Sequence, residues 1–321
     1  MKNLTILTIA VVISIVTLSL TLQESKRKPH IVFVMGDEEY RSEESMPMLG
    51  QILHRELGAK ISLCYPLDSV GNINPNINNN IVGLEALKKA DMMVVFTRWR
   101  ELPKNQAKMI TDFAETGKPM AGFRTATHTF MYKTDSSMMH LNNEWSHKVF
   151  GQQWITHHGH FDDNKYPLTS VYLKEGANTP ILNGVKPFQA YSWLYHVNGG
   201  KWKINPNTKP FLEGKSLKSQ HEKDNKLDQY PLTQSVAWTN SYTGKSGKTA
   251  RVFFTTLGHP SDFKDVSMRK LALNGIYWAL GLEKKIPADG VNAEIVGTYE
   301  PNDSGFGEKF KKNMKPLVIG K

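Results

Sequence analysis

The chain has 321 residues, 40% of them hydrophobic and 22% charged, which is the composition of a globular protein with a full hydrophobic core. Its net charge of +10 is spread along the chain, as in LKSQHEKDNK at 217–226, and is not gathered in one block. Nucleic-acid binders concentrate positive charge on one face, so the pattern predicts a solvated lysine-rich surface and argues against nucleic-acid binding.

Residues 1–22 have the pattern of an export signal. Lys2 is followed by a long run without charged residues, which is the order of an n-region and an h-region. The sequence therefore predicts an exported protein, periplasmic or extracellular. Because basic ESKRK follows the run and no A-x-A site does, an uncleaved membrane anchor through residues 4–22 is the alternative. The single cysteine, Cys64, excludes an internal disulfide.

Short apolar runs alternate with helical patterns between residues 29 and 123. Strands are expected at 30–36, 59–66, 91–98 and 118–123, and helices at 45–58, 81–90 and 102–117. Repeated strand–helix–strand units form parallel strands with right-handed crossovers. The pattern therefore predicts a flavodoxin-like, doubly wound α/β fold, with a mostly parallel sheet and helices on both faces.

The second half of the chain is less regular. Strands are expected at 168–176 and 189–197 in an added sheet region, and at 234–242 and 250–258, before a closing helix at 266–281. The segment GKSGKT at 244–249 lacks the P-loop spacing and leads into no helix, so we expect a hairpin turn there. The expected organisation is a leader at 1–28, one domain at 29–285 and a C-terminal strap or tail at 286–321.

Chemically active side chains follow the expected parallel strands. Ligands of open parallel sheets bind outside the carboxyl ends of the strands. The residues expected at this edge are Asp37, Glu38, Glu39, Tyr40, Arg41, Arg98, Trp99, Arg100, Arg124, Thr125, His128, His259 and Asp262. Arginine, histidine, tryptophan and carboxylates favour a pocket there, while the alternative is a set of ordinary polar surface loops.

The segment FRTATHTF at 123–130 carries the most specific hypothesis. If a helix begins near Thr125 or Thr127, His128 falls in its first turn, where the helix dipole lowers the histidine pKa. A neutral imidazole can then accept or relay a proton. The alternative is that His128 only caps the turn or packs in the core.

Two further residues extend this hypothesis. Arg124 at the bend could grip an anionic or carbonyl oxygen, or it could form a structural salt bridge with Glu38 or Glu39. His259 follows the strand at 250–258 and would complete an acid–base set without a nucleophile. The alternative for His259 is a hydrogen bond to a loop carbonyl.

The densest polar cluster is WITHHGHFDD at 154–163. Its spacing matches no standard zinc helix, and a strand would divide its side chains between two faces. We therefore expect no metal, and we expect His158 or His160, with Asp162, to line the pocket or fix the loop. A metal-dependent hydrolase is the alternative, and it would require the three histidines to converge within coordination distance.

Four segments carry a family resemblance, namely PMAGFRTATHTF at 119–130, VAWTNSY at 236–242, ARVFFTTLGHPSDF at 250–263 and LNGIYWALG at 273–281. In this order, after three β–α units, they resemble the ThuA-like trehalose-utilisation family over roughly residues 29–285. The leader and the tail VGTYEPNDSGFGEKFKK at 296–312 are also similar to exported family members.

The resemblance implies a fold like that of class I glutamine amidotransferases, whose cysteine nucleophile stands on the elbow after a central strand. Arg124 occupies that elbow here and no G-x-C-x-G is present, so amidotransfer is not implied. The DE-x-Y motif frequent in the family corresponds to YSWLYH at 191–196. Tyr195 fits this motif, but Ser192 and Trp193 replace the acids. What the resemblance implies is a part in disaccharide or oxidised-sugar metabolism.

These observations together predict an exported α/β enzyme that acts on a sugar or keto-sugar by proton transfer, in an isomerisation or a hydrolysis, without a cofactor. His128 and His259 would carry protons, and Arg124 would hold the polarised oxygen. The residues expected to contact the ligand are Glu38, Glu39, Arg98, Trp99, His158, His160 and Tyr195. The rival hypothesis is a non-catalytic carbohydrate-binding or scaffolding protein, and a homo-oligomer is compatible with both.

Overall fold

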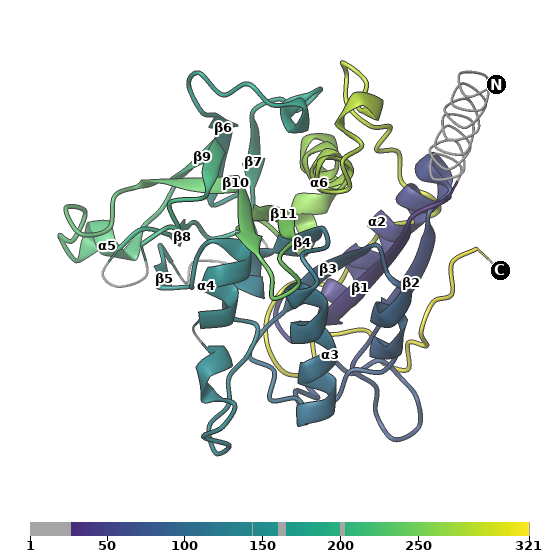
Figure 1. Cartoon of the computed structure of the whole chain (residues 1–321). Coiled ribbons are helices and arrows are strands. Elements are labelled where there is room, and N and C mark those ends of the chain that lie inside the picture. The colour runs from purple at the N-terminus through teal and green to yellow at the C-terminus, as the bar shows by residue number, and fades with distance from the viewer. Residues whose placement is uncertain (1–26, 143, 160–164, 200–202, 321) are drawn as a thin grey trace, which may run out of the picture.

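A computed structural model describes residues 27–142, 144–159, 165–199 and 203–320. One nine-stranded sheet crosses the molecule in the order β2-β1-β3-β4-β11-β10-β9-β6-β7 (Figure 1). Its parallel strands are β2 (Lys60–Cys64), β1 (His30–Gly36), β3 (Met92–Thr97), β4 (Met120–Phe123) and β11 (Thr249–Thr255). This is the strand order of flavodoxin-like folds, so the predicted doubly wound α/β class is confirmed.

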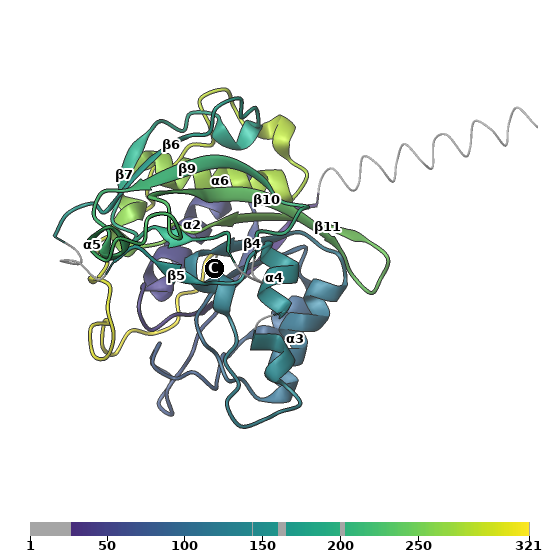
Figure 2. The same cartoon turned by 90° about the vertical axis from the view of Figure 1, so that its left-hand side faces the viewer.

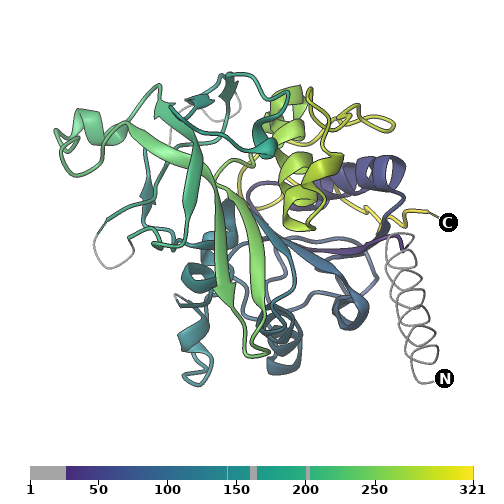
Figure 3. The same cartoon turned by 45° about the horizontal axis from the view of Figure 1, so that its top comes forward.

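Helices cover both faces of the parallel strands, as predicted (Figures 1 and 3). The helices α2 (Ser42–Leu57) and α6 (Val266–Ala279) lie on one face, and α3 (Lys104–Glu115) and α4 (Glu144–Phe150) lie on the other. The helix predicted at 81–90 is only a 3₁₀ turn, because Gly83 adopts a φ of 98° directly before it and Ala90 is extended directly after it. The short helical turns are η1 (Leu84–Lys89), η2 (Arg124–His128), η3 (Met139–Asn142), η4 (Pro180–Leu182), α5 (Gln220–Lys223), η6 (Pro260–Lys264) and η7 (Glu283–Lys285).

The added sheet region is an antiparallel extension of the same sheet. Its strands are β10 (Thr233–Thr243), β9 (Lys209–Ser216), β6 (Thr169–Leu173) and β7 (Phe188–Ala190). The predicted turn joins β10 to β11 as a hairpin that reaches the end of α3, where the amide of Ser246 donates to the carbonyl of Glu115 at 3.1 Å (Figure 2). A separate ribbon pairs β5 (Thr156–His157) with β8 (Tyr195–His196).

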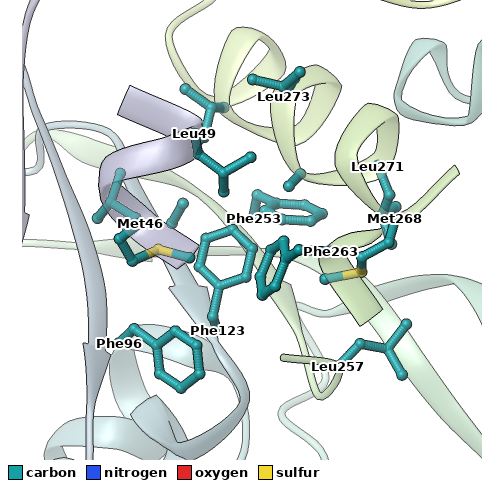
Figure 4. Close-up of a cluster of buried hydrophobic side chains, with 14 of the residues drawn as sticks. Met46, Leu49, Phe96, Phe123, Phe253, Leu257, Phe263, Met268, Leu271 and Leu273 are labelled. Carbon is teal, nitrogen blue, oxygen red and sulfur yellow. The ribbon is translucent and has the colours of Figure 1, made fainter. Parts of the chain in front are cut away.

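Aromatic side chains fill the core on both sides of the sheet. Phe123 on β4 lies 6.1 Å, ring centroid to centroid, from both Phe253 and Phe263, beneath α2 and α6 (Figure 4). On the opposite face, Phe254 packs against Phe150 at 5.5 Å. Successive strand residues point to opposite faces, so the pair at 253–254 serves both cores. Each such buried ring contributes about 1.5–3 kcal/mol to folding.

The segment after η7 packs against the first half of the chain (Figure 1, yellow). Ile286, Val291 and Ala293 are buried in the same core cluster as α2 and α6. Further along, the amide of Gly305 donates to the carbonyl of Glu39 at 2.8 Å. The C-terminal segment therefore reaches the carboxyl end of β1, where the chemically active loops were expected.

No helix among the described residues has both the length and the apolar character needed to cross a bilayer. The export signal expected at 1–22 lies outside the described residues. Export and anchoring therefore stay predictions from the sequence.

Two helix-interior glycines make a test of this packing. An added Cβ at Gly275 in α6 would lie 2.5 Å from the ring of Phe253. One at Gly50 in α2 would lie 3.1 Å from a methyl group of Ile61 and of Ile319, and 3.7 Å from the ring of Phe33. Gly275→Ala should lower the free energy of unfolding by about 1–2 kcal/mol, because overpacking outweighs the gain in helix propensity. Gly50→Ala should change it by less than about 1 kcal/mol. If urea titrations gave the same change in unfolding free energy for both variants, this packing would be contradicted.

Candidate functional site

The carboxyl ends of β1, β3, β4 and β11 bring four polar loops to one edge of the sheet. The loop after β1 is joined to the loop after β4, because the carboxylate of Asp37 accepts a hydrogen bond from the hydroxyl of Thr125. It is joined to the loop after β3 by an ion pair between Glu38 and Arg98. We call the group formed by Glu39, Arg98, Arg124, His128 and Tyr195 the edge site.

The bend after β4 is a strained elbow at Arg124. Its φ of 42° lies in the left-handed region, directly after the extended residue Phe123. Such a backbone costs a residue with a side chain about 1–2 kcal/mol. Gly258 permits this bend, because a Cβ at that position would lie 2.9 Å from the Cβ of Arg124. Packing around the elbow therefore holds a conformation that the chain alone disfavours.

The guanidinium of Arg124 is fully buried. It donates to the carbonyls of Thr256 at 2.9 Å and Trp193 at 3.2 Å, and to the hydroxyl of Tyr40 at 2.9 Å. Its Cζ also lies 4.1 Å from the ring centroid of Tyr40 and 4.5 Å from that of Tyr195. The side chain therefore joins four segments of the chain and does not point into solvent.

Arg124 does not form the salt bridge with Glu38 or Glu39 that was its alternative role, because other arginines pair with these two carboxylates. Glu38 pairs with Arg98 and Arg100, and Arg98 Nε lies 3.1 Å from a carboxylate oxygen of Glu39. Burial raises the pKa of Glu39 to about 7, against the opposing effect of Arg98. At neutral pH this carboxyl group is therefore close to its midpoint of titration, as a general acid or base requires.

Asp37 fixes the position of this acidic loop. One of its carboxylate oxygens accepts from the amides of Glu39 at 2.7 Å and Tyr40 at 2.8 Å, and the other accepts from the hydroxyl of Thr125. A carboxylate that accepts local amides in this way forms an Asx-type turn. Asp37 thus orients Glu39 and Tyr40 relative to the elbow.

His128 is enclosed by aromatic rings. Its ring centroid lies 5.3 Å from Trp154, 5.6 Å from Trp99 and 6.3 Å from Tyr195. Its Nδ1 lies 3.1 Å from the hydroxyl of Thr127. This is the one side-chain hydrogen bond that His128 makes in the described part of the chain.

The pKa of His128 is lowered, as predicted, but the cause predicted for this lowering is wrong. His128 is the last residue of the five-residue turn η2 and does not lie in the first turn of a helix. Its pKa is held well below the usual value by burial, and next by the charges of Arg98 and Arg124. The imidazole is therefore neutral at pH 7 without any contribution from a helix dipole.

Tyr195 connects His128 to the charged part of the edge site. It stacks on Arg124, and burial raises its pKa, with Arg124 opposing and Glu39 adding to the rise. In the β5–β8 ribbon Tyr195 pairs with His157, so both side chains lie on the face turned toward His128.

His259 has both ring nitrogens engaged. Its Nδ1 accepts from the amide of Ser261 at 3.0 Å, so Nε2 carries the proton and donates to the hydroxyl of Ser304 at 3.0 Å. Burial lowers the pKa of His259 to about 3, and Arg124 adds to this effect. The structure thus places His259 as the cap of η6 and the anchor of the C-terminal segment.

Asp262 is the centre of a second hydrogen-bond network. Its fully buried carboxylate accepts from the amides of Gly258, His259 and Tyr191 at 3.1, 3.0 and 2.6 Å. It also accepts from the hydroxyl of Ser192 at 2.5 Å. Ser192, which stands where the resembled family often has an acid, therefore holds a distant carboxylate in place.

His158 lies apart from the edge site. Its Nδ1 is 2.9 Å from the hydroxyl of Ser219, and its ring centroid lies 5.3 Å from that of His221. Burial lowers the pKa of His158 to about 4, with further lowering by His221 and His196. His160 lies outside the described residues. Among those described, no group of three or more histidine, cysteine or acidic side chains is arranged to hold a metal ion.

Comparison with known proteins leaves the family open. No family model matches the sequence, and no curated protein matches it. Among solved structures, a protein from Parabacteroides merdae described as ThuA-like is similar, with 13% identity, a TM-score of 0.49 and coverage of 91% of this chain and 100% of that one.

Two further structures are more distant. The exo-β-1,4-mannosidase Op5Man5 from Opitutaceae bacterium strain TAV5 shares 9% identity over 80% of this chain and 37% of that one, with a TM-score of 0.36. The N-terminal domain of mmIFT52 shares 9% identity over 78% and 96%, with a TM-score of 0.41. At these values none of the three likenesses assigns a function.

The buried guanidinium can be tested by Arg124→Met. Its removal leaves the carbonyls of Thr256 and Trp193 without their donor, so the free energy of unfolding should fall by about 2–4 kcal/mol. The control is Arg251→Met, because Arg251 forms a half-exposed ion pair with Glu283. That variant should lose about 1 kcal/mol or less. If urea titrations gave the same loss of unfolding free energy for both variants, a structural role of the buried Arg124 guanidinium would be contradicted.

The neutral state of His259 predicts a pH dependence of stability. Its pKa is about 3 in the folded chain and 6.5 in an unstructured peptide, so between these values the unfolded chain binds a proton that the folded chain does not. His259→Asn keeps an acceptor for the amide of Ser261 but cannot be protonated. The stability advantage of the wild type over this variant should therefore shrink by about 2 kcal/mol between pH 7 and pH 5. A constant difference would contradict a buried neutral His259.

Proposed function

We propose that this chain is a ThuA-like protein that acts on a sugar or keto-sugar by proton transfer at the edge site. The sequence resemblance supports this, because two of its four segments contain the elbow at Arg124 and the turn at His259. The fold supports it too, since these segments lie at the strand ends where ligands of doubly wound sheets bind.

One observation carries the proposal. Burial raises the pKa of the Glu39 carboxyl group to about 7 and keeps the imidazole of His128 neutral, and both groups are close to Tyr195. The ring of Tyr195 lies 6.3 Å from that of His128, and the charge of Glu39 helps to raise the pKa of Tyr195. Burial has opposite effects on the two pKa values, because it disfavours the charged form of each group. The edge site therefore offers a proton acceptor, His128, and a partly protonated donor, Glu39, at the same pH.

This pair suits the isomerisation of a keto-sugar. One group removes the proton from the carbon next to the carbonyl, and the other gives a proton to the carbonyl oxygen, so an enediol forms and no bond to the protein is needed. Neutral His128 would be the base and protonated Glu39 the acid. The imidazolium of His128 then gives its proton to the former carbonyl carbon, while the carboxylate of Glu39 takes the proton of the other enediol hydroxyl. The carbonyl group has then moved by one carbon, and both side chains are back in their starting protonation states.

The aromatic side chains supply a surface for a sugar ring. Trp99 and Trp154 lie beside His128, and the ring of Trp193 packs against that of His157, with 4.7 Å between their centroids. Faces of this kind suit the C–H side of a pyranose, while the charged groups suit its hydroxyls. The buried Arg124 and His259 are assigned to positioning Tyr40, Tyr195 and the C-terminal segment.

A non-catalytic carbohydrate-binding protein is the second candidate. The observation that favours it is the elbow itself, where a fully enclosed arginine stands in the position of the cysteine nucleophile of amidotransferases. Export, inferred from residues 1–22, is part of both proposals. The two candidates differ in turnover and not in binding.

The direct test is a thermal-shift screen against disaccharides and keto-sugars, followed by detection of product by NMR. A ligand that binds only the folded state raises the unfolding midpoint in a concentration-dependent way. A bound sugar that is converted supports the enzyme, and a bound sugar that is never converted supports the binding protein. No shift with any sugar contradicts both.

For a converted sugar, His128→Ala and Glu39→Gln should each lower kcat/KM by about 100-fold or more. The wild-type pH–rate profile should show an apparent pKa of about 7 that Glu39→Gln removes. The control is Glu213→Gln, since Glu213 pairs with Lys174 on the antiparallel extension. Unchanged rates in both edge-site variants would contradict the assigned roles.

A further inference from the structure

We propose that a pocket adjoining Trp99 is a second sugar subsite, so that the edge site takes a ligand of two joined rings. This inference rests on the proposed function and adds the size of the substrate to it. The pocket has a volume of about 200 Å³ and is lined mainly by Glu38, Asn76, Asn78, Trp99, Arg100 and Lys133. That volume is the share of about six or seven water molecules, which suits one small ring and excludes a chain of rings.

Trp99 is the wall between the pocket and the edge site. Its ring packs against His128 at 5.6 Å and Trp154 at 6.3 Å, and the same residue lines the pocket. The guanidinium of Arg98 lies 3.6 Å from the centroid of the Trp99 ring. The backbone of Trp99 has a φ of 47°, which is in the left-handed region. An indole fixed in this way offers a rigid apolar surface at the junction of two rings.

The floor of the pocket is rigid. Arg100 donates to the carbonyls of Pro75 at 3.1 Å and Ile77 at 2.9 Å, and it also pairs with Glu38. These contacts hold the asparagine-rich loop against the loop after β3. The pocket is therefore formed before any ligand binds, which reduces the entropy lost on binding.

The rim of the pocket carries polar groups that the protein does not use. Among the described residues, neither the amide of Asn78 nor the ammonium of Lys133 has a side-chain hydrogen bond or an ion pair. The side-chain nitrogen of Asn76 donates to the carbonyl of Gly307 at 3.0 Å, and the side-chain oxygen of Asn76 has no partner among the described residues. Donors and acceptors placed in this way can bind the hydroxyl groups of a sugar.

The charges at the pocket favour a neutral ligand. Glu38 lines the pocket, so a phosphate or a carboxylate there would lie against its negative charge, and the positive charge of Arg100 is already paired with it. The one remaining cation among the residues that line it is Lys133, at the exposed rim. A neutral ring with several hydroxyls fits this arrangement better than a phosphorylated one.

A second aromatic side chain stands close by, on the C-terminal segment. Phe306 is 54% exposed, and its ring centroid lies 4.9 Å from the Cζ of Arg98. The neighbouring residues are tied down, Gly305 to Glu39 and Gly307 to Asn76. An aromatic ring held in this way beside the pocket can pack against the apolar face of a sugar ring.

The test compares one-ring and two-ring sugars by calorimetry. The probes are glucose, trehalose, maltose and cellobiose, and the proteins are the wild type, the double variant Asn78→Ala with Lys133→Met, and Phe306→Ala. The control is Asn178→Ala, because Asn178 is exposed and lies on the loop before η4, which contributes nothing to the pocket. Unfolding midpoints, which all four proteins should share, show that the variants fold.

We expect at least one disaccharide to bind the wild type about tenfold more tightly than glucose. The double variant should bind this disaccharide about five- to tenfold more weakly than the wild type does. Its affinity for glucose should stay within about twofold of the wild-type value. Phe306→Ala should weaken the disaccharide in the same direction, and the control should change neither sugar.

The results distinguish a failure of the proposed function from a failure of the second subsite. If the wild type binds no sugar, the proposed function is overturned and the subsite with it. If the wild type binds sugars but prefers no disaccharide, or the double variant loses nothing, the second subsite is overturned and the proposed function stands. If the double variant loses glucose and disaccharide equally, the pocket holds the only ring, which also overturns the inference.

Discussion

The arrangement of the edge site depends on one buried cation. Arg124 sits at the elbow after β4 without a carboxylate partner among the described residues, and its charge is balanced by two carbonyls, one hydroxyl and two aromatic faces. Those partners come from the loop after β1, from β8 with the segment before it, and from the residue that follows β11. Because an uncompensated charge in the interior is very costly, each partner is held to the position that the guanidinium requires.

Around this cation the charges are arranged in two layers. The outer layer is the pairing of Glu38 with Arg98 and Arg100, which is partly accessible to solvent. The inner layer consists of groups that burial keeps uncharged, such as His128 and, near neutral pH, part of the Glu39 population. Acid–base chemistry needs groups of the second kind. Burial favours the uncharged form of both groups, while the positive charges of Arg98 and Arg124 favour neutral His128 and oppose neutral Glu39.

The sequence was informative where its signals were periodic or local. The parallel strands and their helices follow from apolar runs and helical spacing, and the strand ends follow from the topology, so Glu39, Arg98 and His128 could be placed at one edge. The contacts that decide the roles could not be predicted. Ser304 meets His259 across 45 residues, and His157, not its neighbour His158, pairs with Tyr195 in the two-residue β5–β8 ribbon. Neither contact leaves a repeating pattern in the chain.

The C-terminal segment also makes the edge site depend on a contact that can open by itself. Ser304 is bonded to His259, and the amide of Gly305 donates to the carbonyl of Glu39. An amide held in this way exchanges its hydrogen with solvent only when the segment detaches. Exchange at Gly305 would therefore report local detachment of the segment, separately from global unfolding of the sheet.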